Sequence, residues 1–266
     1  MYMSYYSMSF NPFDKDIDVK YLYETEDLKS IKSRLEYLKS NKGLGLFTGE
    51  SGLGKTVAIR DFCCKLNPNL YKVMYISMST ITVLEFYKAI AYELGLEAKM
   101  RKIDIFKQIQ EEVIRLVRDK KITPILIIDE AQYLKTDILN DLKILLNYEM
   151  DSKNYLTLIL IGQPILISIL NRNIHEAIRQ RIIVSYSYSG LTKDEMNEYI
   201  DTRLLLCGSD KNIFNDNARE ALFSGCNGII RKLNSLIVKS LIIGCNKQVQ
   251  AIDNNITLEA YNEISL

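Results

Sequence analysis

Metal-binding and disulfide-forming side chains are scarce in this sequence. It has one histidine and five cysteines in 266 residues, and no two cysteines form a Cys-x-x-Cys pair. A structural zinc site needs several Cys or His ligands at short spacings. The composition therefore disfavours a zinc site and a disulfide framework, and we expect reduced thiols in a cytoplasmic protein.

Long apolar runs and a strong net charge are also missing. No apolar run reaches the roughly 18 residues of a transmembrane helix, and the start, MYMSYYSMSFNPF, lacks a basic segment followed by an apolar one. We therefore expect no membrane span and no signal peptide. The net charge is +1, so contact with nucleic acid needs a local patch. KMRK at 99–102 and RDKK at 118–121 are candidates, with solvated loop charge as the alternative for both.

Short apolar segments alternate with helical patterns over the first 190 residues, which is typical of an α/β fold with a parallel sheet. The predicted strands are 44–47, 72–78, 124–129, 156–162 and 181–187. Thr82 and Glu85 predict a capping box for a helix that stops at Gly95. Helical spacing also covers 105–117 and 137–150.

The pattern changes after Gly190, where helices follow one another without a convincing strand. Thr192 and Glu195 predict a capping box for a helix to about Leu206, and Asn215 is the predicted cap of a second. Residues 228–243 have the spacing of a third. We predict two domains, an α/β core at 1–190 and a small helical domain at 191–266.

The segment GESGLGKT matches the pattern GxxxxGKT of a phosphate-binding loop, or P-loop. Its glycines let backbone amides turn towards phosphate oxygens, and the following helix points its positive end at the same place. Lys55 adds a charge for the β and γ phosphates, and the Thr56 hydroxyl is a magnesium ligand. The predicted nucleotide-binding residues are Gly49, Glu50, Ser51, Gly52, Leu53, Gly54, Lys55, Thr56 and Val57.

Two carboxylates end the most apolar predicted strand. Asp129 is the predicted second ligand of magnesium, and Glu130 would orient and polarise the attacking water. Gln163 follows the fourth strand, where its amide could touch the γ-phosphate or the water; an ordinary turn is the alternative. NKQV at 246–249 lacks the aspartate of a guanine-recognition motif, so ATP is the predicted nucleotide.

Three arginines have no evident local role. Arg179 and Arg181 precede a β-branched run, and no acidic residue lies between Ile178 and the end of that run. We predict that one of them, Arg181 first, reaches the γ-phosphate in a neighbouring subunit, with a salt bridge inside the chain as the alternative. Arg231 is a candidate phosphate contact in the helical domain, or else a solvated helix arginine.

Together these residues resemble the AAA+ ATPases, and more narrowly the ExeA-like group. The shared motifs are NPF (11–13), the P-loop, IIDEAQ (127–132), LLN (145–147), GQP (162–164), RQRI (179–182) and G-x-x-R-x-x-N (228–234). The resemblance implies a P-loop AAA+ core with a five-stranded parallel sheet and a C-terminal helical lid. Ile230 departs from it, because proline is expected before the arginine.

The resemblance leaves the biological role open. Secretion-pathway members add a membrane segment and a peptidoglycan-binding module, neither of which is expected here. Others resemble transposition regulators of the MuB, TnsC and TniB kind, which bind double-stranded DNA as ATP-dependent rings or filaments and work with a transposase. We favour the second role, with a secretion or cell-envelope ATPase, or a non-oligomeric P-loop phosphotransferase, as alternatives.

Overall fold

The computed structural model describes residues 2–14, 21–77, 80–149 and 152–264. Its contacts divide the chain into two compact units. The α/β unit comprises Ser30–Glu50 and Lys55–Tyr188, and the helical unit comprises Met1–Lys29, Ser51–Gly54 and Ser189–Leu266. The contacts thus group the first residues of the chain with the C-terminal helices, whereas the sequence suggested a single division at 190.

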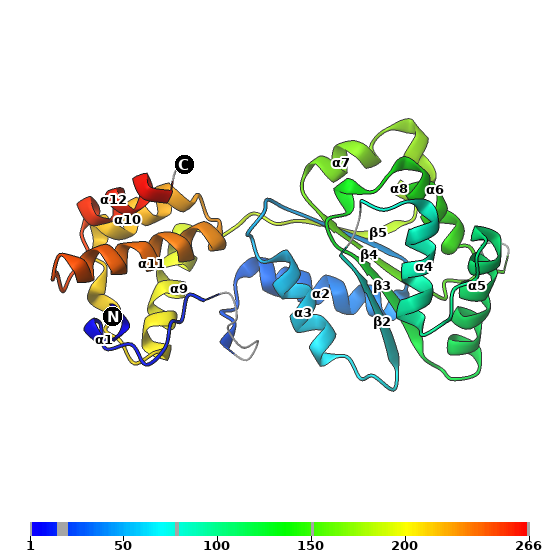
Figure 1. The fold of residues 1–266 in the computed structure, drawn as a ribbon, viewed down its shortest axis with the longest axis horizontal. Coiled ribbons are helices and arrows are strands. Elements are labelled where there is room, and N and C mark those ends of the chain that lie inside the picture. Colours follow the sequence, from blue (N-terminus) through cyan, green and yellow to red (C-terminus); the bar gives the residue numbers. More distant parts are fainter. Residues whose placement is uncertain (1, 15–20, 78–79, 150–151, 265–266) are drawn as a thin grey trace. The chain divides into compact units, whose positions relative to one another are not determined.

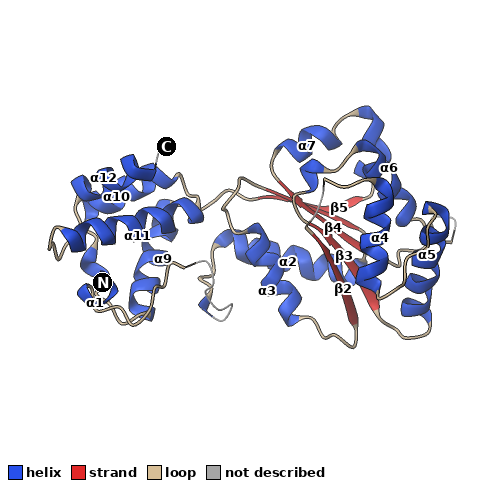
Figure 2. Cartoon of the chain, viewed as in Figure 1, coloured by secondary structure: helices blue, strands red, loops and turns tan. Residues whose placement is uncertain are grey.

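A five-stranded parallel sheet forms the centre of the α/β unit (Figures 1 and 2). Its strand order is β2-β3-β4-β1-β5. The strands are β1 (Leu44–Thr48), β2 (Tyr71–Ile76), β3 (Thr123–Ile128), β4 (Thr157–Gly162) and β5 (Ile182–Ser187). The predicted α/β fold with five parallel strands is confirmed, although the end of the second predicted strand, Met78, lies outside the described residues.

Helices cover both faces of this sheet, which explains the continuous apolar runs in its strands (Figure 1). In β3 and β4, Ile125–Ile128 and Leu158–Ile161 are all buried. The helices are α2 (Glu26–Asn41, its last part), α3 (Lys55–Lys65), α4 (Val83–Leu94), α5 (Lys102–Arg118), α6 (Thr136–Leu145), α7 (Ile165–Leu170) and α8 (Glu176–Arg179).

Local end signals explain the limits of several helices. The capping box of Thr82 and Glu85 is present, and Gly95 ends α4 in the left-handed conformation with φ 81°. The prediction of helix to residue 150 is wrong, because α6 ends at Leu145. Beyond the end of α6, an isolated antiparallel bridge joins Tyr148 and Lys153.

The helical unit has its own apolar core. Its helices are α1 (Tyr2–Tyr5), α9 (Lys193–Leu206), α10 (Asp216–Cys226), α11 (Ile230–Asn246) and α12 (Asn254–Ile264). The predicted caps of Thr192 and Asn215 are both present. Phe13 of the NPF motif is buried in this core, with its ring centroid 6.4 Å from that of Tyr199. Neither α2 nor α12 was indicated by the sequence.

The start of the C-terminal segment is fixed by one carboxylate. Asp27 accepts hydrogen bonds from the amide and hydroxyl of Ser189 and from the amide of Gly190, at 2.9–3.3 Å. Gly190 has φ 84°, and a Cβ there would lie 2.9 Å from the carbonyl oxygen of Gly228. Only glycine adopts this conformation readily in so little space, so Gly190 fixes the turn into α9.

Candidate functional site

The residues of the α/β unit that could carry chemistry gather at the carboxyl ends of the sheet's strands. In this strand order β4 separates β1 from β3, so the segments that leave these three strands are neighbours. The P-loop leaves β1, Asp129 follows β3, and Gln163 follows β4. A hydrogen bond of 3.1 Å from the amide of Gly49 to the carbonyl of Gly162 joins two of these segments.

Lys55 begins α3 and is almost completely buried, at 6% exposure. Its Nζ donates to the carbonyls of Gly49 and Glu50, at 2.7 and 2.8 Å. Thr56 and Val57 follow in the first turn of α3, where backbone amides have no partner within the helix. The lysine charge and the helix N-terminus therefore lie on the same segment, which favours an anion.

The carboxylate of Asp129 joins two further elements and its own neighbour. Its Oδ2 accepts from the hydroxyls of Thr56 and Tyr75, both at 2.8 Å, and its Oδ1 accepts from the amide of Glu130 at 2.9 Å. Burial, followed by the hydrogen bond and charge of Asp129, raises the pKa of Tyr75. Tyr75 therefore stays a hydrogen-bond donor at neutral pH.

The oxygen atoms of Thr56 and Asp129 suit magnesium, which binds hard oxygen ligands and usually takes only one or two carboxylates from the protein. The side chains already meet at 2.8 Å. Within the described part of the chain, no group of three or more His, Cys, Asp or Glu residues could hold a metal ion. The donors therefore fit a magnesium ion that takes its remaining ligands from phosphate and water.

Glu130 is held by a residue that the sequence did not mark as functional. The backbone of Glu130 is left-handed, with φ 51° and ψ 40°. Its Oε2 accepts from Nε2 of Gln132 at 2.5 Å, and Oε1 of Gln132 accepts from the amide of Gln163 at 3.0 Å. The structure thus connects both predicted catalytic residues, Glu130 and Gln163, through one buried amide.

The tip of the P-loop has its contacts inside the helical unit. The amide of Arg231 donates to the carbonyl of Gly52 at 3.1 Å, and its Nη1 donates to Oγ of Ser51 at 3.3 Å. Leu53 is buried in the same unit. Ile230, at the position where proline was expected, is the first residue of α11. The first helical position is the one that proline favours, and here the helix begins with isoleucine in its place.

The two arginines before β5 lie at the opposite end of the sheet, where the strands begin. Ile182, the first residue of β5, pairs with Leu44, the first residue of β1. The five residues of β1 separate this end from the P-loop by about 16 Å. Nη1 of Arg179 donates to the carbonyl of Asn171 at 3.2 Å, and Arg181 lines a hollow together with Lys143 and Ile144. The structure therefore does not place these arginines beside Lys55.

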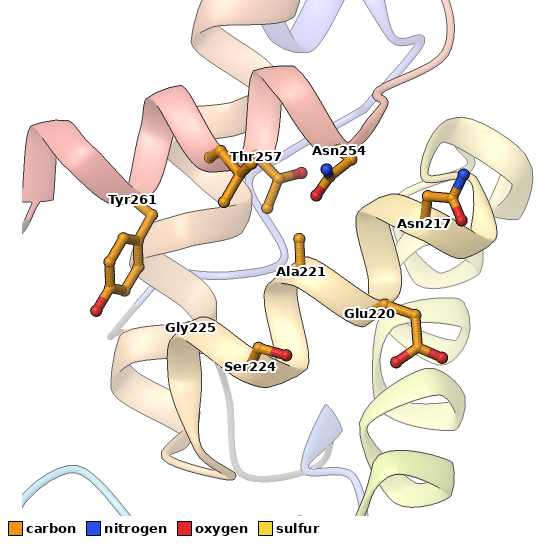
Figure 3. A pocket seen from close by; sticks show the side chains of 9 residues that line it. Asn217, Glu220, Ala221, Ser224, Gly225, Asn254, Thr257 and Tyr261 are labelled. Atoms are coloured by element: carbon orange, nitrogen blue, oxygen red, sulfur yellow. The ribbon is translucent and has the colours of Figure 1, made fainter.

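A second hollow lies between α10 and α12 of the helical unit (Figure 3). Asn217, Glu220 and Ser224 line it from α10, and Thr257 and Tyr261 line it from α12. None of the predicted site residues lines it.

A glycine-rich loop between a strand and a helix, a lysine and threonine at its end, and an aspartate after a neighbouring parallel strand define a P-loop nucleotide-binding protein. The model of the AAA domain family matches residues 38–170. The chain therefore belongs to this family, as its motifs predicted.

The curated relatives have different biological roles. General secretion pathway protein A of Aeromonas hydrophila is 30% identical over 268 residues, covering 98% of this chain and 48% of that protein. The ATP-dependent target DNA activator B of Escherichia phage Mu is 28% identical over 123 residues, covering 46% of this chain and 37% of that protein. The chain thus spans half or less of the length of these two relatives.

Solved structures confirm the fold. Cdc6p from Pyrobaculum aerophilum superimposes with a TM-score of 0.67 at 15% identity, covering 91% of this chain and 67% of that one. The Thermotoga maritima RuvB Holliday junction branch migration motor gives 0.60 at 18%, covering 95% and 73%. In the described part of the chain, no helix has both the length and the apolar character needed to cross a bilayer.

The contacts of Asp129 predict a measurable loss of stability. Asp129→Ala leaves two hydroxyls and one amide without their acceptor, and we expect it to lower the free energy of unfolding by about 1–2 kcal/mol. Urea denaturation in EDTA, followed by circular dichroism, measures this. Asp137→Ala removes an exposed carboxylate at the start of α6 and should stay within about 0.5 kcal/mol of wild type. Equal midpoints for the two variants would show that the Asp129 contacts do not stabilise the fold.

Proposed function

We propose that this protein binds ATP with magnesium and hydrolyses it. One observation carries the proposal: the Thr56 hydroxyl meets the Asp129 carboxylate at the end of a P-loop whose lysine is already drawn into the loop. Gly49–Thr56, with Val57, would bind the phosphates. Bound magnesium would neutralise charge on the β and γ phosphates, and Thr56 and Asp129 would hold it.

The remaining residues divide the work of hydrolysis. Glu130 takes the proton of the attacking water or orients that water, and the side chain of Gln163 contacts the γ-phosphate or the same water. Arg231 contacts a phosphate from the helical unit. Its hydrogen bond to Ser51 of the loop supports this role.

Two substitutions separate binding from hydrolysis. Lys55→Ala should abolish ATP binding, because it removes the buried ammonium group of the loop. Glu130→Gln should bind ATP as wild type does and hydrolyse it at least about 100-fold more slowly. Fluorescent-nucleotide titration and phosphate release measure the two effects, with Lys65→Ala and Glu111→Gln as exposed controls. Normal turnover in Glu130→Gln would remove Glu130 from its proposed role.

We further propose that ATP binding drives self-assembly into a ring or filament, in which Arg181, or second Arg179, reaches the nucleotide of the next subunit. The position of both arginines at the end of the sheet opposite their own P-loop supports this. A guanidinium group supplied from outside stabilises the charge that builds on the transferring phosphoryl group.

Mixing two inactive variants tests the arginine. Arg181→Ala should bind ATP but hydrolyse it about 10³- to 10⁵-fold more slowly. Mixed with Glu130→Gln, which still binds ATP and can therefore assemble, it should regain activity, because the second subunit donates its intact arginine to the first subunit's P-loop. Arg115→Ala, an exposed arginine of α5, is the control. Wild-type rates in both Arg181→Ala and Arg179→Ala would place the arginine elsewhere, with Arg172 the next candidate.

As a biological role we propose an ATP-dependent, double-stranded DNA-binding regulator of transposition that works with a transposase. The likeness to the phage Mu target DNA activator B supports it. The near-neutral charge of one subunit means that repeated patches in an oligomer must supply the affinity. The patch at 99–102 is the first candidate, but Lys102 already pairs with Asp141 at 2.6 Å. Lys99 and Arg101 are thus the better test.

The protein should bind a fluorescently labelled DNA duplex only when ATP is present. Its affinity should fall steeply as the salt concentration rises, because Lys and Arg displace counterions from the DNA phosphates. Reversing the charges of Lys99 and Arg101 should weaken it about tenfold or more at low salt. Reversal of Lys193 and Lys247, which form exposed ion pairs in the helical unit, is the control. The DNA-binding role is contradicted if ATP-loaded wild type ignores the duplex at low salt.

A secretion or cell-envelope ATPase is the second candidate. It is favoured by the alignment of general secretion pathway protein A over 98% of this chain. Association with the membrane fraction of cells, together with failure to bind duplex DNA, would support this role over the first.

A further inference from the structure

We propose that Gln132 is a positioning residue that holds the carboxylate of Glu130 and ties it to the end of β4 at Gln163. The proposal rests on the function proposed for Glu130 above. Gln132 lies on the short 3₁₀ turn Ala131–Tyr133, which directly follows Glu130. Its two side-chain bonds run in opposite directions, from its Nε2 to Glu130 and from the Gln163 amide to its Oε1.

The two partners determine which way the Gln132 amide points. Glu130 offers a carboxylate, which accepts, and Gln163 offers a backbone N–H, which donates. A reversed amide would place oxygen against oxygen and N–H against N–H, so only one orientation satisfies both. With 9% exposure, Gln132 has little water to replace either bond. The amide therefore acts as a fixed link and not as a mobile surface group.

The end of β4 leaves room for this link. A Cβ at Gly162 would lie 2.7 Å from Oε1 of Gln132, so any larger residue there would press on the amide. The absence of a side chain at Gly162 thus allows Gln132 to reach the amide of Gln163. The glycine of the GQP motif therefore makes room for the glutamine of the IIDEAQ motif, so one steric requirement links the two motifs.

The link gives Gln132 a role in hydrolysis and not in binding. Gln163 follows β4, and its backbone is fixed to the same amide that fixes Glu130. A shift of Gln163, for example when its side chain meets a phosphate, is therefore passed through one side chain to the group proposed to orient the water. No hydrogen bond joins Gln132 to the P-loop among the described residues, so loss of the link should leave ATP affinity intact.

Gln132→Glu breaks one bond selectively. It keeps an oxygen that accepts from the Gln163 amide and replaces the donor to Glu130 with a repelling oxygen. We expect kcat to fall about 10- to 100-fold, while KM and the Kd for ATP change less than about twofold. Gln132→Asn, which keeps the amide but shortens its reach, should have the same effect. Gln248→Glu, an exposed glutamine of the helical unit, should hydrolyse ATP as wild type does.

A double-mutant cycle shows whether Gln132 acts through Glu130. If it does, Gln132→Glu added to Glu130→Gln should cause no further loss, measured as single-turnover hydrolysis. Thermal melting with ATP checks that each variant is folded, and the Asn variant serves if the Glu variant is not.

If Glu130→Gln is inactive, three results would each overturn the inference about Gln132 and leave the function proposed for Glu130 intact. The first is wild-type kcat in both Gln132 variants. The second is a parallel loss of ATP affinity and rate. The third is a full additional loss in the double variant. Normal hydrolysis by Glu130→Gln would instead overturn the function proposed for Glu130, and this inference with it.

Discussion

The carboxylate of Asp129 is the group on which the arrangement of the candidate site depends. An acidic side chain that is only 5% exposed would be costly without hydrogen bonds, and this one receives them from Thr56, Tyr75 and the amide of Glu130. These donors come from α3, β2 and the turn after β3. One side chain therefore fixes the start of the P-loop helix against two neighbouring strands. The same contact brings a hydroxyl and a carboxylate together, so that one magnesium ion could bind both.

A second polar link continues from this carboxylate. The amide of Glu130 is bonded to Asp129, its side chain is bonded to Gln132, and Gln132 is bonded to the amide of Gln163. The chain of bonds crosses from the end of β3 to the end of β4. Asp129 and Gln132 are the buried members of this chain, and little water is available to replace their bonds, so displacement of one member affects the next. The proposed water-orienting group is thereby connected to the strand whose end would touch the γ-phosphate.

The sheet separates the charged residues into two groups. The first group lies at the carboxyl ends of the strands and comprises Lys55, which begins the helix after the P-loop, with Asp129, Glu130 and Gln163. The second group, Arg179 and Arg181, precedes β5 at the amino ends of the strands. Parallel strands keep these two ends a strand length apart, about 16 Å here. This separation supports a function that uses more than one subunit, because a residue at the amino end is far from the P-loop of its own chain.

Much of this protein is determined by its sequence alone. The P-loop, the acidic pair after β3 and the capping boxes of Thr82 and Thr192 are local patterns, and a buried parallel strand must be apolar on both faces. The tertiary structure decided the rest. Tyr75 meets Asp129 across 54 positions, Gln132 meets Gln163 across 31, and the N-terminal residues join the helical unit. These contacts depend on which strands are neighbours and which apolar faces pack together, and neither is encoded within a short stretch of chain.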